Sequence, residues 1–417
     1  MTNAREPLTI VTRPSASVSN ILDWIAPDNP LAFVRNGEGI VGIGELLRLE
    51  FRGADRFSEA AAAWSKISRT AIIHDSVTQA GSGLVALGSF AFADSSSAVS
   101  VLIVPRVIIG SRNGIQWVTT IAVGNVSALP DTADSLADMS RTPHGSPVHI
   151  SFTPGEMSSN GFTSTVSAAL REITHGNAAK IVIARDQVAT LPADTDLRMP
   201  IEALSNRYPD TFTFAVDGLI GSSPETLVRV HNGNVSARVL AGSAARGDDR
   251  ISDGQAAATL AASAKDQQEH ALALASVMDA LQPLSSELFA ASTPFALQLP
   301  NLWHLATDIE GQLTEHSSAL DLIKILHPTA AVAGTPTPSA IRIIDELEGF
   351  DRGRYAGPVG WVDANGNGEW AVALRCAQVA GTRITAYAGA GIVLGSDAQR
   401  ELAETELKFR PIIEAFG

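Results

Sequence analysis

Hydrophobic and polar residues follow two different patterns on either side of residue 150. Residues 1–150 contain short runs rich in β-branched residues, such as VALGSFAF, VSVLIVPRVII and IQWVTTIAV, separated by turn residues. Such runs are typical of antiparallel strands, so we expect a sheet with helices on one side. The segment near 140–160 is rich in Ser, Pro and Gly, which makes it a candidate boundary between two halves of the chain.

Helical patterns are found mainly after this boundary. GFTSTVSAALREITHG predicts one helix, the alanine-rich stretch 254–281 predicts a second, long one, and a last helix is expected from about Asp397. Strands are expected from Lys180 onward (KIVIARDQVA), as a pair in DTFTFAVDGLIGSSPETLVRV with a tight turn at 221–224, and at 301–311, 358–364, 369–378 and 383–389. Strands grouped with strands, and helices apart, indicate an α+β fold.

Composition and charge narrow the class of protein. The chain has 417 residues, of which 45% are hydrophobic and 18% charged, as expected for a globular protein with a sizeable core. The net charge of −14 argues against a nucleic acid or an anionic membrane as partner, and an anionic substrate would need a locally positive or metal-bearing pocket. A single cysteine, Cys376, excludes an internal disulfide and a thiolate zinc site. No run approaches the roughly 18–20 apolar residues that span a bilayer, and we expect a cytoplasmic protein.

Two motifs resemble binding loops but lack the context that such loops need. GAGIVLG at 389–395 resembles a dinucleotide-binding loop, yet only 22 residues follow it, which leaves no room for the strand that carries the acidic ribose ligand. DANGNG at 363–368 copies the first half of a calcium loop, but Leu374 occupies the twelfth position, where a bidentate Glu is required. We interpret the second segment as a hairpin loop built from Asn and Gly.

Two pairs of carboxylates have the spacing that places both on one face of a helix. Asp266 and Glu269 are three residues apart, and so are Glu401 and Glu404. Oxygen ligands without a cysteine cluster suit Mg²⁺, which typically binds one or two carboxylates together with an anionic substrate. For any single pair, a solvated acidic face is the more ordinary interpretation.

Four further polar residues each allow a structural and a chemical interpretation. Lys180 opens an apolar strand, either as a strand-end cation or as a base whose pKa is lowered by desolvation. Glu225, His304 and Arg375 could each be a satisfied polar residue at a strand or turn. Their joint occurrence, in this order, favours chemistry.

The order of these segments resembles the chorismate-utilising enzyme family. The matching strings are KIVIARD, GSSPETLVR, LAGSAARG, AKDQQEHALA, LWHLATDIEG, LHPTAAVAG, GPVGWVDANGNGEWAVALRCA, AYAGAGIVLGS and ELAETELK, which cover most of residues 160–417. The resemblance implies one large α+β domain of two stacked, mostly antiparallel β-sheets flanked by helices. Residues 1–150 would form its variable half, and residues 151–417 its chorismate-binding catalytic region.

Within the family, GNGEW and LWHLAT resemble the isochorismate synthases that serve menaquinone or siderophore biosynthesis. Nothing resembles a fused glutaminase, and no glutaminase subunit is expected. Ala331 is small, as in isochorismate synthases, whereas Tyr355 is similar to the residue of the salicylate synthases. A salicylate synthase, which adds pyruvate elimination, therefore stays open as an alternative, as does a non-catalytic chorismate-binding relative.

The resemblance also implies a role for each candidate residue. Mg²⁺ would be held by Glu269 and Glu404, with Asp266 and Glu401 as further carboxylates. Lys180 would be the general base that activates water, and Glu225 the general acid that protonates the departing hydroxyl. The chorismate-binding residues implied are Gly242, Ser243, His304, Ala331, Tyr355, Arg375, Gly389 and Lys408.

Overall fold

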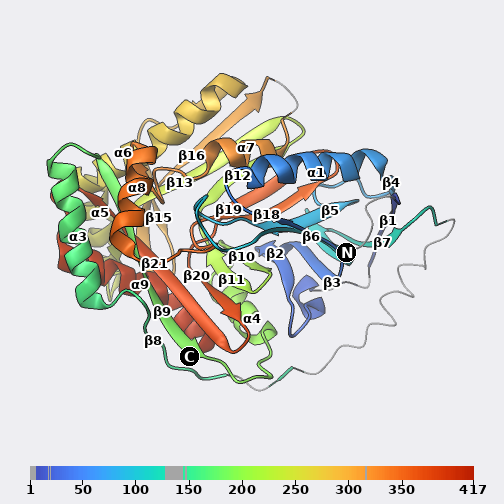
Figure 1. Cartoon of the computed structure of the whole chain (residues 1–417), viewed down its shortest axis with the longest axis horizontal. Coiled ribbons are helices and arrows are strands. Elements are labelled where there is room, and N and C mark those ends of the chain that lie inside the picture. Colours follow the sequence, from blue (N-terminus) through green and yellow to red (C-terminus); the bar gives the residue numbers. More distant parts are fainter. Residues whose placement is uncertain (1–5, 17, 19, 127–143, 146–147, 315–316) are drawn as a thin grey trace.

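The strands form one hydrogen-bonded network that divides into two arms (Figure 1). The structure, a computed structural model, describes residues 6–417 except 17, 19, 127–143, 146–147 and 315–316. The branch point is β6 (Ser100–Arg112), which pairs with both β3 (Glu38–Phe51) and β5 (Val85–Ser89). On the edge opposite β3, next to β5, β6 is extended by β7 (Ile115–Val123), β1 (Leu8–Pro14) and β4 (Ile72–Asp75), of which β1 and β4 run parallel.

Each arm continues from the branch through antiparallel neighbours. The first arm runs from β5 through β18 (Pro358–Asp363), β19 (Gly368–Val372), β12 (Thr226–His231), β13 (Asn234–Ala245) and β16 (Leu302–Leu313) to β14 (Ser285–Ala290) and β15 (Phe295–Gln298). The second arm runs from β3 through β2 (Leu31–Arg35), β10 (Phe212–Val216), β11 (Leu219–Ser223), β20 (Cys376–Ala380) and β21 (Arg383–Val393) to β9 (Lys180–Thr190), which also pairs with β8 (Thr153–Pro154) and β17 (Gly334–Thr335).

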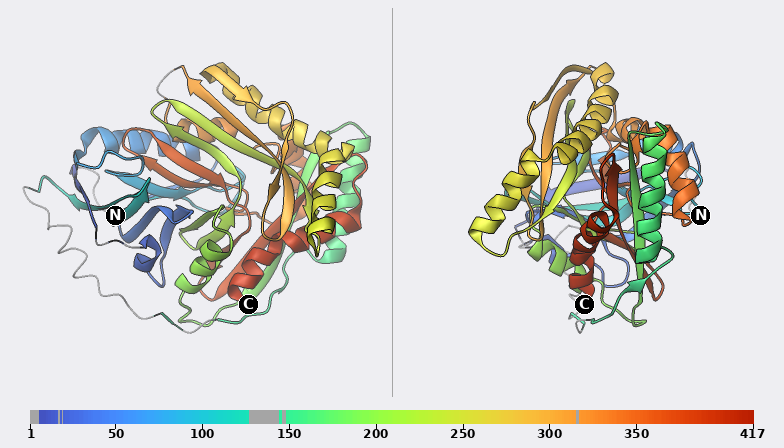
Figure 2. Two further views of the ribbon diagram at one scale, coloured as in Figure 1. Left: turned by 180° about the vertical axis from the view of Figure 1, so that it is seen from behind. Right: turned by 90° about the vertical axis from the view of Figure 1, so that its left-hand side faces the viewer.

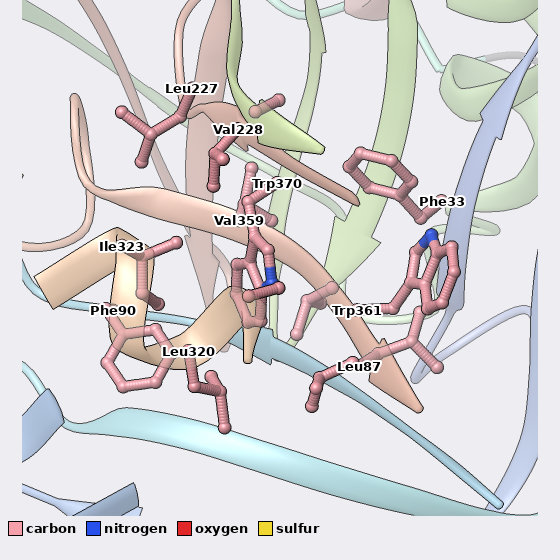
Figure 3. Packing of buried hydrophobic residues seen from close by; sticks show 14 of the residues in the cluster. Phe33, Leu87, Phe90, Leu227, Val228, Leu320, Ile323, Val359, Trp361 and Trp370 are labelled. Carbon is pink, nitrogen blue, oxygen red and sulfur yellow. The ribbon is translucent and has the colours of Figure 1, made fainter. Parts of the chain in front are cut away.

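The largest hydrophobic core lies between the two arms and continues on the other face of the first arm. Phe33 of the second arm is in one cluster with Leu87 and Trp361 of the first, and Trp370, on the opposite face, packs against Phe90 at 5.6 Å between ring centroids (Figure 3). The two tryptophans are at most 1% exposed. Burying aromatic surface of this size contributes on the order of 2–3 kcal/mol per side chain. The α+β fold of two stacked, mostly antiparallel sheets is therefore confirmed, with the sheets joined at β6.

Helices cover the outer faces of the arms. The first arm carries α1 (Arg56–Thr70), α7 (Ala319–Leu326), α5 (Arg250–Ala262) and α6 (Ala264–Leu281), and the second carries α3 (Ser159–Thr174), α4 (Arg198–Arg207), α8 (Thr337–Glu348) and α9 (Ala398–Phe416). Figure 2 shows α3, α5, α8 and α9 gathered at one end of the molecule. None of the helices in the described ranges is long and apolar enough to cross a membrane.

Several sequence-based expectations need correction. The long helix at 254–281 is two helices, because Ser263 adopts an extended conformation (φ −72°, ψ 112°) and caps α6. β11 and β12 do not pair with each other, and the chain turns at 224–225 between them. The strand at 369–378 is interrupted at Arg375, whose φ is 48°. The hairpin at DANGNG is confirmed, since β18 pairs with β19.

The boundary near residue 150 does not separate two domains. β2 pairs with β10, and β5 pairs with β18, so strands from before and after the boundary belong to the same sheets. Part of the proposed boundary segment lies outside the described residues. The division into a variable half at 1–150 and a catalytic region at 151–417 stays a prediction.

Candidate active site

One pocket lies where the two arms meet α6 and α9, and most of the candidate residues line it. It bounds about 580 Å³ of space not filled by atoms, a figure that includes its open mouth. The sequence-predicted residues in its wall are Glu225, Gly242, Ser243, Glu269, His304, Ala331, Tyr355, Arg375, Gly389 and Lys408. Asp266, Glu401 and Glu404 line an adjoining cavity that shares Ser243 with the first. Residues far apart in the chain therefore converge: Lys180 opens β9 and Val393 ends β21, 213 positions later, yet the two are register partners.

Lys180 is fully buried at the start of β9. Its ammonium lies 3.2 Å from Glu269 Oε1 and, among the described residues, forms this ion pair but no well-aligned hydrogen bond. A buried cation with a single partner is costly to desolvate, which indicates a functional rather than a purely structural lysine.

Gly391 provides the space for that ion pair, and the sequence analysis missed it. A Cβ on residue 391 would lie 2.0 Å from Glu269 Oε1 and 3.0 Å from Lys180 Cε. Gly391 lies within strand β21, together with Gly389. A glycine inside a strand is the available signal, because it often marks a close approach of another group.

Glu225 lies between β11 and β12, with its side chain buried in the pocket wall. Burial raises the pKa of this carboxyl to about 8, against the opposing charges of Lys180, Arg375 and Lys408. Glu225 is therefore largely protonated at neutral pH, as a general acid must be.

His304 is held as a neutral ring with a defined tautomer. Arg375 Nη2 donates to His304 Nε2 at 2.6 Å, so Nε2 must be unprotonated. The hydrogen on Nδ1 then donates to Gly242 O at 3.1 Å, with Ser243 Oγ also 3.0 Å away. Burial, and then the charges of Arg375 and Lys408, lower the pKa of His304 well below its usual value. The ring thus orients Arg375, which sequence reasoning did not anticipate.

The side chain of Arg375 points into the pocket because the strand is interrupted at this residue. With φ at 48°, it adopts the left-handed conformation, which non-glycine residues rarely take. Its side chain is buried and lines the pocket instead of alternating along the strand. Strained backbone of this kind often occurs at functional sites.

The four carboxylates come from α6 and α9, as the helix spacing predicts. The Lys265 ammonium lies among three of them, 2.9 Å from Glu401, 3.7 Å from Asp266 and 3.9 Å from Glu269. The fourth, Glu404, pairs with Lys408 at 2.5 Å. Lys408 also donates to Gly389 O at 2.9 Å, which joins the carboxylates to the substrate-facing wall.

This arrangement concentrates negative charge. Burial and the neighbouring Glu404 raise the pKa of Glu401 to about 7, and burial also raises the pKa of Asp266. The four carboxylates have fewer positive charges near them than they carry negative ones, and the Lys265 ammonium lies between three of them. Such a group of oxygens fits a hard divalent cation such as Mg²⁺. No three acidic, His or Cys side chains within the described ranges already converge at ligand distances, so some of the carboxylates would have to rotate to bind it.

Comparison with known proteins agrees with this site. Residues 16–417 match the model of the family described as "Chorismate binding enzyme". Isochorismate synthase DhbC of Bacillus subtilis is 39% identical over 264 residues, 60% of this chain and 66% of that protein. Isochorismate synthase EntC of Escherichia coli is 41% identical over 243 residues, 57% of this chain and 62% of that protein. The alignments thus span just under two thirds of these two relatives.

Solved structures extend the likeness over nearly the whole chain. MenF, the menaquinone-specific isochorismate synthase of Escherichia coli, superposes with a TM-score of 0.81 at 25% identity, over 99% of this chain and 95% of that one. Anthranilate synthase component I of Streptococcus pneumoniae shares the fold with a TM-score of 0.65 at 20% identity, over 98% of this chain and 92% of that one. With a family model matched over almost the full length, and the residues that the family motif implies gathered around one pocket, the chain belongs to the chorismate-binding enzyme family.

Proposed function

We propose that the protein isomerises chorismate to isochorismate. The observation that carries the proposal is that a buried lysine and a buried, protonated glutamic acid lie beside the same pocket. Lys180 lies behind the pocket wall, next to Glu269, and Glu225 is part of the wall itself. Addition of water at C2 with loss of the C4 hydroxyl needs one group to accept a proton and another to donate one. Relatives named as isochorismate synthases support the choice of reaction.

The residues divide the steps between them. Lys180, as the neutral amine, takes a proton from water while the water oxygen bonds to C2 and the ring double bonds shift. The C4–O bond breaks, and Glu225 gives its proton to the leaving hydroxyl, which departs as water. One water is consumed and one released, so the reaction is an isomerisation, and the proton gained by Lys180 must return to Glu225 before the next turnover.

Substrate carboxylates would be bound by groups on the opposite wall. Gly242 and Ser243 offer backbone and hydroxyl donors, and Arg375 and Lys408 offer charge-assisted contacts. Glu269 and Glu404, with Asp266 and Glu401 beside them, would hold Mg²⁺. When bound, this ion supplies positive charge that attracts the ring carboxylate and withdraws electron density from the ring.

A second candidate is salicylate synthase activity, which the position of Tyr355 favours. Its ring lines the pocket, stacked on Tyr387 with centroids 5.3 Å apart and planes 13° apart. A tyrosine here resembles the enzymes that go on to eliminate pyruvate, whereas Ala331, in the same wall, resembles those that do not.

One assay separates these activities. The protein is incubated with chorismate and Mg²⁺, with and without ammonia, and the products are identified by chromatography. We expect isochorismate alone. Salicylate with pyruvate would select the second candidate, and an aminated product would select the ammonia-using branch of the family. If no product forms, the protein binds chorismate without converting it.

A further inference from the structure

A buried ion pair lies behind the pocket wall and does not line the pocket. Glu348 ends α8, and Arg352 follows it in the next turn, with side chains 1% and 2% exposed. Arg352 Nε donates to Glu348 Oε2 at 2.8 Å, and Nη2 donates to the other carboxylate oxygen. Neither residue is among those that line the pocket.

The same pair bonds to the backbone of two pocket-wall segments. Arg352 Nη1 donates to Val332 O at 2.9 Å, and Nη2 donates to Val182 O at 2.8 Å. From the other partner, Glu348 Oε1 accepts from Ala184 N at 2.7 Å. The guanidinium fork thus uses four of its N–H groups at fixed angles, two toward Glu348 and two toward the backbone, which a flexible ammonium cannot reproduce.

These bonds hold the segments that carry the proposed base and the specificity wall. Val182 lies two residues after Lys180 on β9, and Val332 follows Ala331; both valines line the pocket. Val182 N also donates to Ala333 O at 2.9 Å, which joins the two segments directly. Arg352 O accepts from Tyr355 N at 3.0 Å, so the pair also fixes the start of a third wall segment.

The opposite wall makes no direct side-chain hydrogen bond to this pair among the described residues. Gly242 and Ser243 belong to β13, and Lys408 belongs to α9. Among the described residues, the hydrogen bonds of their side chains run to His304, Glu404 and Gly389, not to Glu348 or Arg352. A substitution that breaks the Glu348–Arg352 pair should therefore displace the Lys180 side of the pocket and leave the carboxylate-binding side in place.

We propose that the Glu348–Arg352 pair is a positioning element that sets the place of Lys180 and of the wall at Ala331. The proposal rests on the proposed function, since the position of Lys180 matters only if it is the base. Misplacing a reacting group by about 1 Å can cost roughly 100-fold in rate. The pair therefore acts on turnover and not merely on stability.

The test compares Arg352→Gln and Arg352→Lys with Arg198→Gln. Arg198 is another arginine with little exposed surface, paired with Asp196, and neither residue lines the pocket. We expect both Arg352 variants to lower kcat by about 10- to 100-fold with KM changed less than about threefold. Arg352→Lys should regain much of the thermal stability but not kcat. Arg198→Gln should lose stability with kcat within about twofold of wild type.

If the single variants do not fold, the double variant Glu348→Gln/Arg352→Gln leaves no unpaired buried charge and serves in their place. The proposal is overturned if Arg352→Lys restores kcat, or if the loss of kcat in Arg352→Gln is matched in Arg198→Gln. A wild-type protein without turnover would instead refute the proposed function. Hydrogen exchange at 181–184 and 332–334 then still decides the positioning role, because faster exchange there in Arg352→Lys supports it and unchanged exchange contradicts it.

Discussion

At the scale of single residues, the site depends on how burial sets protonation. Glu225 and Lys180 are both buried, but only Lys180 has a carboxylate within 3.2 Å. A buried carboxyl without a partner favours its neutral form, which suits Glu225 to the proposed role of proton donor.

Replacing the lysine tests its role directly. Lys180→Ala should lower kcat by at least about 100-fold, the usual contribution of a general base. Substrate binding should be retained, because the carboxylate-binding groups lie on the other wall. Steady-state kinetics together with calorimetric titration of chorismate would measure both quantities. Lys324→Ala, on the exposed side of α7, is the control, and turnover of Lys180→Ala within a fewfold of that control would remove the base assignment.

The pKa of Glu225 makes a prediction about pH. Because the proposed reaction needs the protonated carboxyl, kcat/KM, which reports the free enzyme, should fall as pH rises through about 8. Stability should follow the same direction: the folded state holds a proton that the unfolded state has lost above about pH 4.5, so the free energy of unfolding falls between that pH and about 8. Glu225→Gln should abolish turnover and remove this part of the pH dependence. Denaturant unfolding at pH 5 and pH 8 measures it, and an identical pH dependence in both proteins would contradict the assignment.

The glycine at 391 should not tolerate a side chain. Gly391→Ala places a methyl 2.0 Å from Glu269 Oε1, so the carboxylate must move away from Lys180. We expect turnover to fall by at least about tenfold, as for a displaced catalytic group. Gly254→Ala, in α5 with no atom within 4 Å of the new methyl, is the matched control and should be neutral or slightly stabilising. Equal kinetics in the two variants would show that Glu269 is not fixed by this contact.

At the scale of elements, the residues at which α6 and α9 begin determine where the carboxylates lie. Ser263 interrupts what otherwise reads as one alanine-rich helix, and its hydroxyl accepts from Asp266 N at 3.3 Å. The break directs the first two turns of α6, with Asp266 and Glu269, toward α9. Alanine content alone predicts one continuous helix, because the cap is favoured only once tertiary contacts reward the new direction.

Ser263→Ala should therefore affect the metal site more than its stability cost suggests. Loss of the cap costs about 1 kcal/mol, and the Mg²⁺ concentration for half-maximal activity should rise several-fold as Asp266 and Glu269 lose their fixed position. Ser318→Ala removes the matching cap of α7, which also accepts at 3.3 Å but carries none of the carboxylates. Its stability loss should be similar and its Mg²⁺ requirement unchanged. A similar rise in both would attribute the effect to general destabilisation.

At the scale of the whole molecule, the site joins both arms. β13 of the first arm and β21 of the second contribute facing walls, and α6 and α9 contribute the carboxylates. A ligand that bridges the arms binds only the folded chain, so it must stabilise the whole protein through mass action.

Metal binding should be visible without any assay of turnover. At a Mg²⁺ concentration 100 times its Kd, folding should gain about 2.7 kcal/mol, which raises Tm by a few degrees. Chelation with EDTA should reverse the shift and stop turnover. The double variant Glu269→Gln/Glu404→Gln should show no shift. Full activity after exhaustive chelation would refute the carboxylate site.

The local pattern of the chain was sufficient for much of the fold. Strand periodicity placed β9, β16, β18 and β21, and the cap at Asp397 placed the start of α9. It failed at Ser263 and at Arg375, where the backbone departs from the local preference. Ser263 is extended, an ordinary conformation, whereas the left-handed backbone of Arg375 is strained, and such strain is maintained by the surrounding packing and not by neighbours in sequence.

The sequence by itself determined which chemical groups are present: two pairs of carboxylates at helical spacing, a lysine at a strand start, and the motif order that identifies the family. Only the tertiary structure decided that Lys180 faces Glu269, that Gly391 leaves room for them, that His304 orients Arg375, and that Glu348 and Arg352 hold the wall behind. The reason is physical. Composition and periodicity report what each residue prefers locally, whereas burial, pKa and contact distance arise from groups that the folded chain brings together from remote positions.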